Sequence, residues 1–161
     1  MLTIMYRSEA ATLLPFSELT QICLTSAHKN RALGITGFLI EFDGIFLQVL
    51  EGESDAVDRL YDRIRADPRH RNVELLLREA GDTGRSFGFW AMNFGPLNDH
   101  DFWRGVFGRP MGLPEFARRS HDPDFALEVL SRAYLHACTV ADINPSVRDF
   151  VHGAIPSFAS A

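Results

Sequence analysis

The sequence predicts an α+β fold in which a mixed five-stranded sheet carries two helices on one face and is followed by C-terminal helices. Three observations lead to this prediction: an apolar run near the N-terminus, a hairpin around Asp43-Gly44, and two segments of helical spacing on either side of that hairpin. The elements follow in the order strand, helix, strand, strand, helix, strand, with an extra strand added. This order is typical of a ferredoxin-like sandwich, whose helices cover one side of the sheet.

The hairpin lies within Ile35–Gly52, which reads ITGFLIEFDGIFLQVLEG. An Asp-Gly dipeptide joins its two apolar runs, and this dipeptide favours a type I′ turn because both turn positions need a positive φ. With a turn of two residues, Phe42 pairs with Ile45 and Leu39 pairs with Gln48. The second strand is apolar on both of its faces, which indicates a central strand that is covered on both sides.

Gln48 is the exception in this apolar strand. A buried amide without hydrogen-bond partners costs roughly 1–3 kcal/mol, so we expect a partner for it. Two interpretations are open from the strand alone. Gln48 is either a structural residue that bonds to a nearby loop or to the backbone, or it faces a polar ligand held against the sheet.

The other elements of the sandwich are placed by apolar periodicity and by residues that start or stop helices. Ser17 is the expected N-cap of the first helix, which ends near Asn30. Ser54 is the expected N-cap of the second helix, which Asp67-Pro68 ends. The three remaining strands are expected at Leu2–Tyr6, Val73–Leu77 and Phe87–Phe94.

The composition changes from Pro96 onward, where polar residues and chain-breaking prolines and glycines precede a longer helix. This helix, from Phe125 to about Val140, is apolar over more than one face and therefore needs two surfaces to bury it. One is expected to be the bare face of the sheet and the other a neighbouring subunit, which predicts a homo-oligomer. Shorter helices are expected at Pro114–Arg119 and around Pro145–Val151. We therefore divide the chain into a sandwich domain at 1–97 and a helical extension at 98–161, without a separate effector domain.

The net charge, the cysteine content and the absence of certain motifs exclude several classes of protein. The net charge of −5 gives no reason to expect a nucleic acid or an anionic membrane as a partner. No apolar run approaches the roughly 20 residues of a membrane-spanning helix, and no signal peptide is visible, so we expect a cytoplasmic protein. Cys23 and Cys138 make no metal-ligand spacing and fit a reducing compartment, although a single disulfide stays open. The sequence also lacks the phosphate-binding, dinucleotide-binding, nucleophile and zinc motifs of common enzymes, so neither catalysis nor a metal is expected.

A set of short motifs follows one another along residues 1–97: Tyr6-Arg7-Ser8, Asn30 six residues before Thr36-Gly37, Phe46 to Gly52, Asp67-Pro68-Arg69-His70, and Phe87 followed by Trp90 and Met92. Each motif is weak alone, but their order and spacing together are specific. The set resembles the BLUF family of blue-light sensors that use FAD. The residues that follow match no effector domain, so the chain looks like a short, stand-alone member.

The resemblance implies that oxidised FAD lies between the two helices and against the sheet, with FMN and riboflavin as alternatives. Asn30 would hold the O4/N3 edge of the flavin ring, and Gln48 would bridge Tyr6 and the N5/O4 edge. The remaining flavin contacts that the resemblance implies are Ile22, Lys29, Arg63, Ile64, Asp67, Arg69 and His70, with Lys29 in a peripheral role.

By analogy with the family, the excited flavin takes an electron and then a proton from Tyr6, and a rearranged Gln48 remains after recombination. The change would pass to Trp90 or Met92 on the last strand; which of the two faces the flavin in the dark stays open. That strand leads into the C-terminal helices, so the resemblance implies a photoreceptor, not an enzyme, that signals to a separate partner protein of unknown identity. The alternative, from the residues alone, is a flavin-free ferredoxin-like module for protein interaction.

Overall fold

The computed structural model describes residues 1–81, 84–87, 94–96 and 100–140. The predicted α+β fold is confirmed, and four antiparallel strands form the body of its sheet. A segment of three residues, β5, pairs in parallel with the edge strand β2. The strands lie in the order β4 (His70–Ala80), β1 (Leu2–Ala10), β3 (Ile45–Gly52), β2 (Thr36–Phe42) and β5 (Phe94–Pro96). The longer strand expected at Phe87–Phe94 falls largely outside the described residues.

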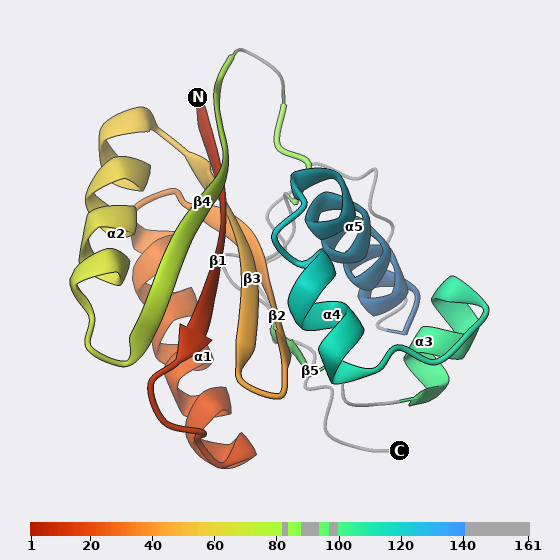
Figure 1. Cartoon of the computed structure of the whole chain (residues 1–161). Coiled ribbons are helices and arrows are strands. Elements are labelled where there is room, and N and C mark those ends of the chain that lie inside the picture. Colours follow the sequence, from red (N-terminus) through yellow and green to blue (C-terminus); the bar gives the residue numbers. More distant parts are fainter. Residues whose placement is uncertain (82–83, 88–93, 97–99, 141–161) are drawn as a thin grey trace.

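Helices cover both faces of the sheet (Figure 1). Helices α1 (Phe16–Ala32) and α2 (Ser54–Ala66) lie on one face, which we call the pocket face. The opposite face, which we call the extension face, carries α3 (His100–Phe107), α4 (Leu113–Arg119) and α5 (Pro123–Val140). Each face has its own cluster of buried apolar side chains.

The hairpin has the predicted register, with Phe42 opposite Ile45 and Leu39 opposite Gln48. Asp43 and Gly44 have φ angles of 46° and 85°, which is the left-handed conformation that a two-residue turn of this type requires. Every residue of β3 is buried, as expected for a strand covered on both faces. Leu50 belongs to the cluster on the pocket face, and the neighbouring position Val49 belongs to the cluster on the extension face.

Both predicted helix caps are wrong by one or two residues. Helix α1 begins at Phe16 and its N-cap position is Pro15, whose carbonyl oxygen accepts the first helical hydrogen bonds, so Ser17 lies inside the first turn. Helix α2 has Glu53 as its N-cap, and the Glu53 side chain accepts a hydrogen bond from the Ala56 N–H at 3.2 Å. Glu53 thus caps a free N–H group of the first turn, a role that the shorter side chains of serine and aspartate usually have.

Strands β1 and β4 are longer than the apolar pattern predicted. Strand β1 continues to Ala10 because β3 and β4 pair with it on either side, so Tyr6 lies in the middle of the strand and not at its end. Strand β4 begins at His70, before the start that was expected at Val73. The helix α3 was not predicted from the sequence, because it starts with polar residues. The structure nevertheless buries its apolar side chains Phe102 and Trp103.

The long helix α5 packs on the sheet as predicted. Val129, Leu130 and Ala133 are buried in the cluster of the extension face. On its other side, Leu127 and Leu135 remain exposed, and the neighbouring subunit expected there stays a prediction. The helix expected at 145–151 lies outside the described residues. Among the residues that the structure describes, no helix combines the length and apolarity needed to cross a bilayer.

Candidate functional site

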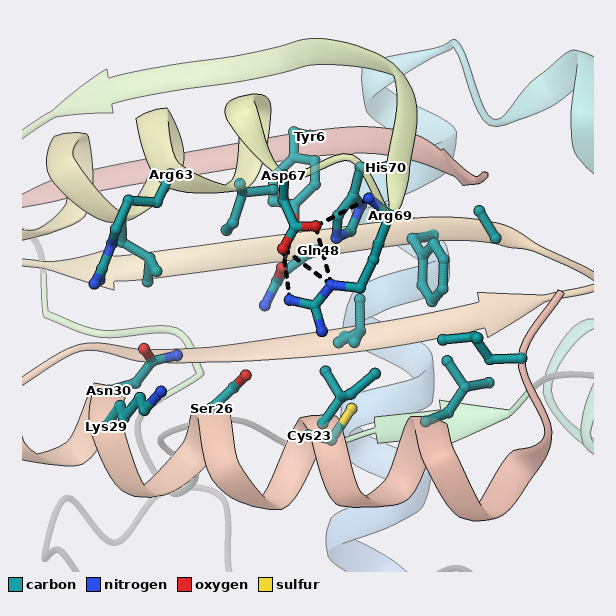
Figure 2. A pocket seen from close by; sticks show the side chains of 18 of the residues that line it. Tyr6, Cys23, Ser26, Lys29, Asn30, Gln48, Arg63, Asp67, Arg69 and His70 are labelled. Carbon is teal, nitrogen blue, oxygen red and sulfur yellow. Dashed lines mark hydrogen bonds and ion pairs between the residues drawn. The ribbon is translucent and has the colours of Figure 1, made fainter. Parts of the chain in front are cut away.

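A cavity of about 250 Å³ lies between the pocket face of the sheet and the helices α1 and α2 (Figure 2). It gathers side chains that are far apart in the sequence, from both helices, from the strands β1, β2, β3 and β4, and from the segments that precede α1 and follow α2. All the described residues for which the sequence implied a flavin contact line this one cavity: Tyr6, Ile22, Lys29, Asn30, Gln48, Arg63, Ile64, Asp67, Arg69 and His70. Their contact with a flavin stays a prediction.

Tyr6 and Gln48 are direct register partners on β1 and β3. The Tyr6 hydroxyl donates a hydrogen bond to Gln48 Oε1, and both side chains are buried. Burial raises the pKa of Tyr6 well above its ordinary value, with a smaller contribution from Tyr61, so the phenol stays protonated and acts as a donor. The amide oxygen in the apolar strand therefore has a side-chain partner, and that partner is a phenol at the floor of the cavity.

Asn30 offers a hydrogen-bond donor at the cavity. Its side chain is only 2% exposed, and its Nδ2 has no hydrogen-bond partner among the described residues. Such a buried amide costs roughly 1–3 kcal/mol unless something accepts its hydrogens. The helix α1, which was expected to end near Asn30, continues to Ala32 and has Leu33 as its C-cap, so Asn30 is not its cap residue. A ligand with a carbonyl group at this edge of the cavity would satisfy the amide.

The walls of the cavity are largely aliphatic. Ile22 on α1 and Ile64 on α2 line it from the two helices, and Leu39 lines it from the sheet. Further lining residues that the sequence interpretation missed are Ala10, Thr12, Leu14, Leu19, Cys23, Ser26, Phe46 and Leu60. Their spacing contained the signal: positions 19, 22, 23, 26 and 30 share one face of a helix, and Leu39 is opposite Gln48. Apolar walls with a few polar groups at the edge suit a flat aromatic ligand.

Cys23 contributes a sulfur atom to the lining of the cavity. Both Cys23 and Cys138 are free, buried thiols, so the structure has no disulfide between them. Burial raises the pKa of the Cys23 thiol to about 12, which keeps it neutral at physiological pH. It therefore contributes to the cavity as a small apolar group.

Charged residues gather at the side of the cavity near the start of β4 (Figure 2). Asp67 accepts hydrogen bonds from the Arg69 backbone N–H at 2.9 Å and from Arg69 Nη2 at 2.5 Å. These bonds from Arg69 lower the pKa of Asp67 to about 2, so the pair is ionised at neutral pH. His70 Nδ1 lies 2.9 Å from Ser8 Oγ, and burial lowers the pKa of this imidazole, so it is mostly neutral there.

Two expected participants, Trp90 and Met92, lie outside the described residues. The chain just before them is fixed on the sheet, because Glu51 accepts hydrogen bonds from the N–H groups of Ser86 and Phe87, each at 3.0 Å. Phe87 itself is 3% exposed and belongs to the cluster on the extension face. The roles expected of Trp90 and Met92 stay predictions.

Several proteins of known class resemble this chain. The β subunit of photoactivated adenylate cyclase from Euglena gracilis is 42% identical over 74 residues, which is 46% of this chain and 9% of that protein. The dark-state structure of BlrB, a BLUF protein, aligns with a TM-score of 0.67 at 28% identity over 84% of this chain and 96% of that one. A bacterial light-regulated adenylyl cyclase aligns with a TM-score of 0.65 at 33% identity over 75% of this chain and 35% of that one.

The chain spans less than a tenth of the length of these curated cyclase relatives, so the likeness concerns their sensor portion. Residues 1–93 match the BLUF family, whose description is sensors of blue-light using FAD. This match includes β1, α1, the hairpin, α2 and β4, and hence every described residue that lines the cavity. With more than half of its length matched, the chain belongs to the BLUF family of flavin-binding blue-light sensors.

Proposed function

We propose that this chain is a blue-light photoreceptor that binds FAD in the cavity between the sheet and helices α1 and α2. The observation that carries the proposal is the buried hydrogen bond between Tyr6 and Gln48 at the floor of that cavity. An oxidisable phenol and a reorientable amide are hydrogen-bonded to each other in the lining of the cavity that we assign to the flavin. BLUF domains are sensor modules and not themselves enzymes, and we extend this to the whole chain.

The residues present fit a flavin. Ile22 and Ile64 would cover the two sides of a flat ring, and the unpartnered Nδ2 of Asn30 would donate to one of its carbonyl oxygens. Lys29 and Arg63 line the cavity from α1 and α2 and carry positive charge. Cations at this position favour a flavin with a phosphate-bearing tail, FAD or FMN, over riboflavin.

Oxidised flavin, when bound, supplies the absorption of blue light and a strong acceptor for an electron and a proton. Tyr6 is the donor that we assign, because its phenol is buried in the cavity wall and its proton already lies in a hydrogen bond to Gln48. Gln48 has an acceptor and a donor on one terminal group, so rotation or tautomerisation would exchange which of them meets Tyr6. A changed Gln48 amide is the stored signal in this proposal.

One exchanged hydrogen bond is worth only about 1 kcal/mol. The segments that respond to it must therefore have two arrangements of nearly equal free energy. We assign the response to the last strand, with Trp90 or Met92 as the neighbour of Gln48, and to the helices that follow it. In this division, residues 1–97 sense light and residues 98–161 relay the change to a separate effector protein. The light-regulated adenylyl cyclases among the relatives are examples of such output in fused form. The exposed Leu127 and Leu135 support an additional contact between copies of the chain through α5.

The test is an absorption spectrum of the FAD-loaded protein in the dark and under blue light, for the wild type and two variants. Tyr6→Phe should keep the flavin and lose the light-induced red shift, because the donor hydroxyl is removed while the ring remains. Tyr61→Phe is the matched control: its ring packs against Tyr6 at a centroid distance of 5.5 Å, but it does not line the cavity. It should bind flavin and shift as the wild type does.

Gln48→Leu should also lose the shift, because an aliphatic side chain cannot exchange hydrogen bonds. A red shift that persists in Tyr6→Phe, or a shift that is lost equally in Tyr61→Phe, would contradict the assignment. A protein that takes up no flavin would contradict the proposed function as a whole.

A further inference from the structure

Arg7 follows Tyr6 directly in β1, and it is one of the largest fully buried side chains of the described chain, at 2% exposed. Successive residues of a strand point to opposite faces, so Tyr6 faces the cavity and Arg7 enters the extension face. A buried guanidinium is costly unless it is well partnered, and an apolar residue would pack in this face more cheaply. The position of Arg7 therefore calls for a reason beyond packing.

The partner of Arg7 lies 113 residues away in the sequence. Arg7 Nε donates a hydrogen bond of 2.8 Å to Ser120 Oγ, and Arg7 Nη1 forms an ion pair of 2.9 Å with Glu9. Ser120 is fully buried and is the C-cap residue of α4; its hydroxyl donates in turn to the Ala117 carbonyl at 3.1 Å. The guanidinium thus holds the junction between α4 and α5 to the strand that carries Tyr6.

A second contact joins the same junction to the next strand. His121 Nδ1 lies 2.5 Å from the Glu74 carboxylate on β4, and Glu74 is the register partner of Arg7. Ser120 and His121 follow each other in the junction. They therefore contact Arg7 on β1 and Glu74 on β4, which are neighbours in the sheet. Any displacement of β1 against β4 at this level would strain one of the two contacts.

The pairing of β1 with β4 is irregular at this level. Its register shifts between Met5 and Tyr6 and again between Arg7 and Glu9, whereas the pairing of β1 with β3 is regular over the same residues. Such irregularities interrupt the ladder and re-aim side chains. Tyr6 and Arg7 thus lie between two irregularities of the β1–β4 ladder.

The geometry points to Arg7 as a positioning residue of the light response: it couples the Tyr6–Gln48 pair to the α4–α5 junction through its hydrogen bond to Ser120. This inference rests on the proposed function and adds to it a route through the centre of the sheet, which is separate from the last strand. A change at the Tyr6 hydroxyl shifts the segment around Tyr6 and Arg7, and the guanidinium carries that shift to the end of α4.

Amide hydrogen exchange of the FAD-loaded full chain, measured in the dark and under blue light, tests this route. In the wild type, illumination should change exchange at residues 113–126, which contain α4 and the start of α5. Ser120→Ala should keep the flavin red shift, since Ser120 does not line the cavity, and should lose the light-induced change at these residues. Thr139→Ala is the matched control, because Thr139 likewise donates to a backbone carbonyl of its own helix, at 3.0 Å, but this bond does not reach the sheet. It should keep both signals.

The wild-type change at 113–126 persisting in Ser120→Ala would overturn the route, and so would a wild type that shifts its spectrum without any change there. Loss of the change in Thr139→Ala would also overturn it, because any weakening of the helices would then suffice. A flavin-loaded wild type without a red shift would instead contradict the proposed function, so the two failures are distinguishable.

Discussion

The two faces of the sheet are built from alternate residues of the same strands, yet they differ in how completely they are filled. On the extension face, aromatic rings pack against one another, with Phe42 and Phe116 at a centroid distance of 5.0 Å and Trp103 next to both. On the pocket face, α1 buries few side chains and leaves a cavity of about 250 Å³. The extension face therefore supplies most of the packing that holds the fold, and the pocket face keeps room for a ligand at a cost in packing.

Gln48 and Leu47 show this difference on adjacent positions of β3. Leu47 is fully buried in the apolar cluster of the extension face, and its role is packing. Gln48 is 4% exposed, but its amide meets the Tyr6 hydroxyl at the cavity. If this comparison holds, substitutions on the extension face should change stability, and substitutions on the pocket face should change ligand binding and the light response.

The largest effect is expected from Phe116→Ala on the extension face. Phe116 is fully buried and contacts the rings of Phe42, Trp103 and Phe125, so its loss should lower the free energy of unfolding by about 3–5 kcal/mol. Phe16→Ala is the control, because Phe16 is 45% exposed, and it should cost less than about 1 kcal/mol. Urea denaturation measures both; equal losses would mean that the extension face is not the main source of stability.

An intermediate effect, on binding and not on folding, is expected from Asn30→Ala. The Asn30 Nδ2 has no partner among the described residues, so the flavin-free protein should lose less than about 1 kcal/mol of stability. Flavin affinity should fall by about 1–3 kcal/mol, roughly 5- to 150-fold, because a donor to the ligand is removed. Fluorescence titration with FAD measures the affinity, and Thr20→Ala, on the same helix but outside the cavity lining, is the control. Unchanged affinity in Asn30→Ala would remove Asn30 from the binding site.

The smallest effect is expected from the Asp67–Arg69 pair at the edge of the cavity. The pKa of Asp67 is lowered from 3.8 to about 2 by its hydrogen bonds from Arg69, so the folded state binds this proton more weakly than the unfolded state. The stability from the pair is present above about pH 4 and is lost as the pH falls toward 2. Because the Arg69 side chain is 56% exposed, water screens the pair and its contribution should be below about 1 kcal/mol.

Acid unfolding curves of the wild type and Asp67→Asn check this prediction. The variant should be slightly less stable at pH 6 and should approach the wild type as the pH falls toward 2, because the folded wild type begins to bind the Asp67 proton there. A difference that grows as the pH falls would contradict the assigned direction of the pKa shift.

Local signals in the sequence predicted the hairpin, its register and the unusual position of Gln48, because each depends on neighbouring residues and strand alternation. The full length of β1 could not be predicted in the same way. Arg7 reads as a residue that ends an apolar strand, but it is buried because Ser120, 113 residues away, accepts its hydrogen bond. The cavity was predicted only through resemblance to a family, since its lining comes from segments that meet only after folding.

The helix α3 shows the same limit on the extension face. Its start is polar, and the burial of Phe102 and Trp103 depends on the sheet and on α5, which no local pattern contains. Where a residue's partner is close in the sequence, or where alternation fixes its face, its environment could be predicted; where the partner is distant, it could not.

The most direct test of the pocket face as a photoactive site is the absorption spectrum of the wild-type protein, loaded with FAD in darkness and then exposed to blue light. We expect the bands of oxidised flavin to move slightly to longer wavelength and to return in the dark. A protein that remains colourless, or one whose bound flavin shows the same spectrum before and after illumination, would contradict the account.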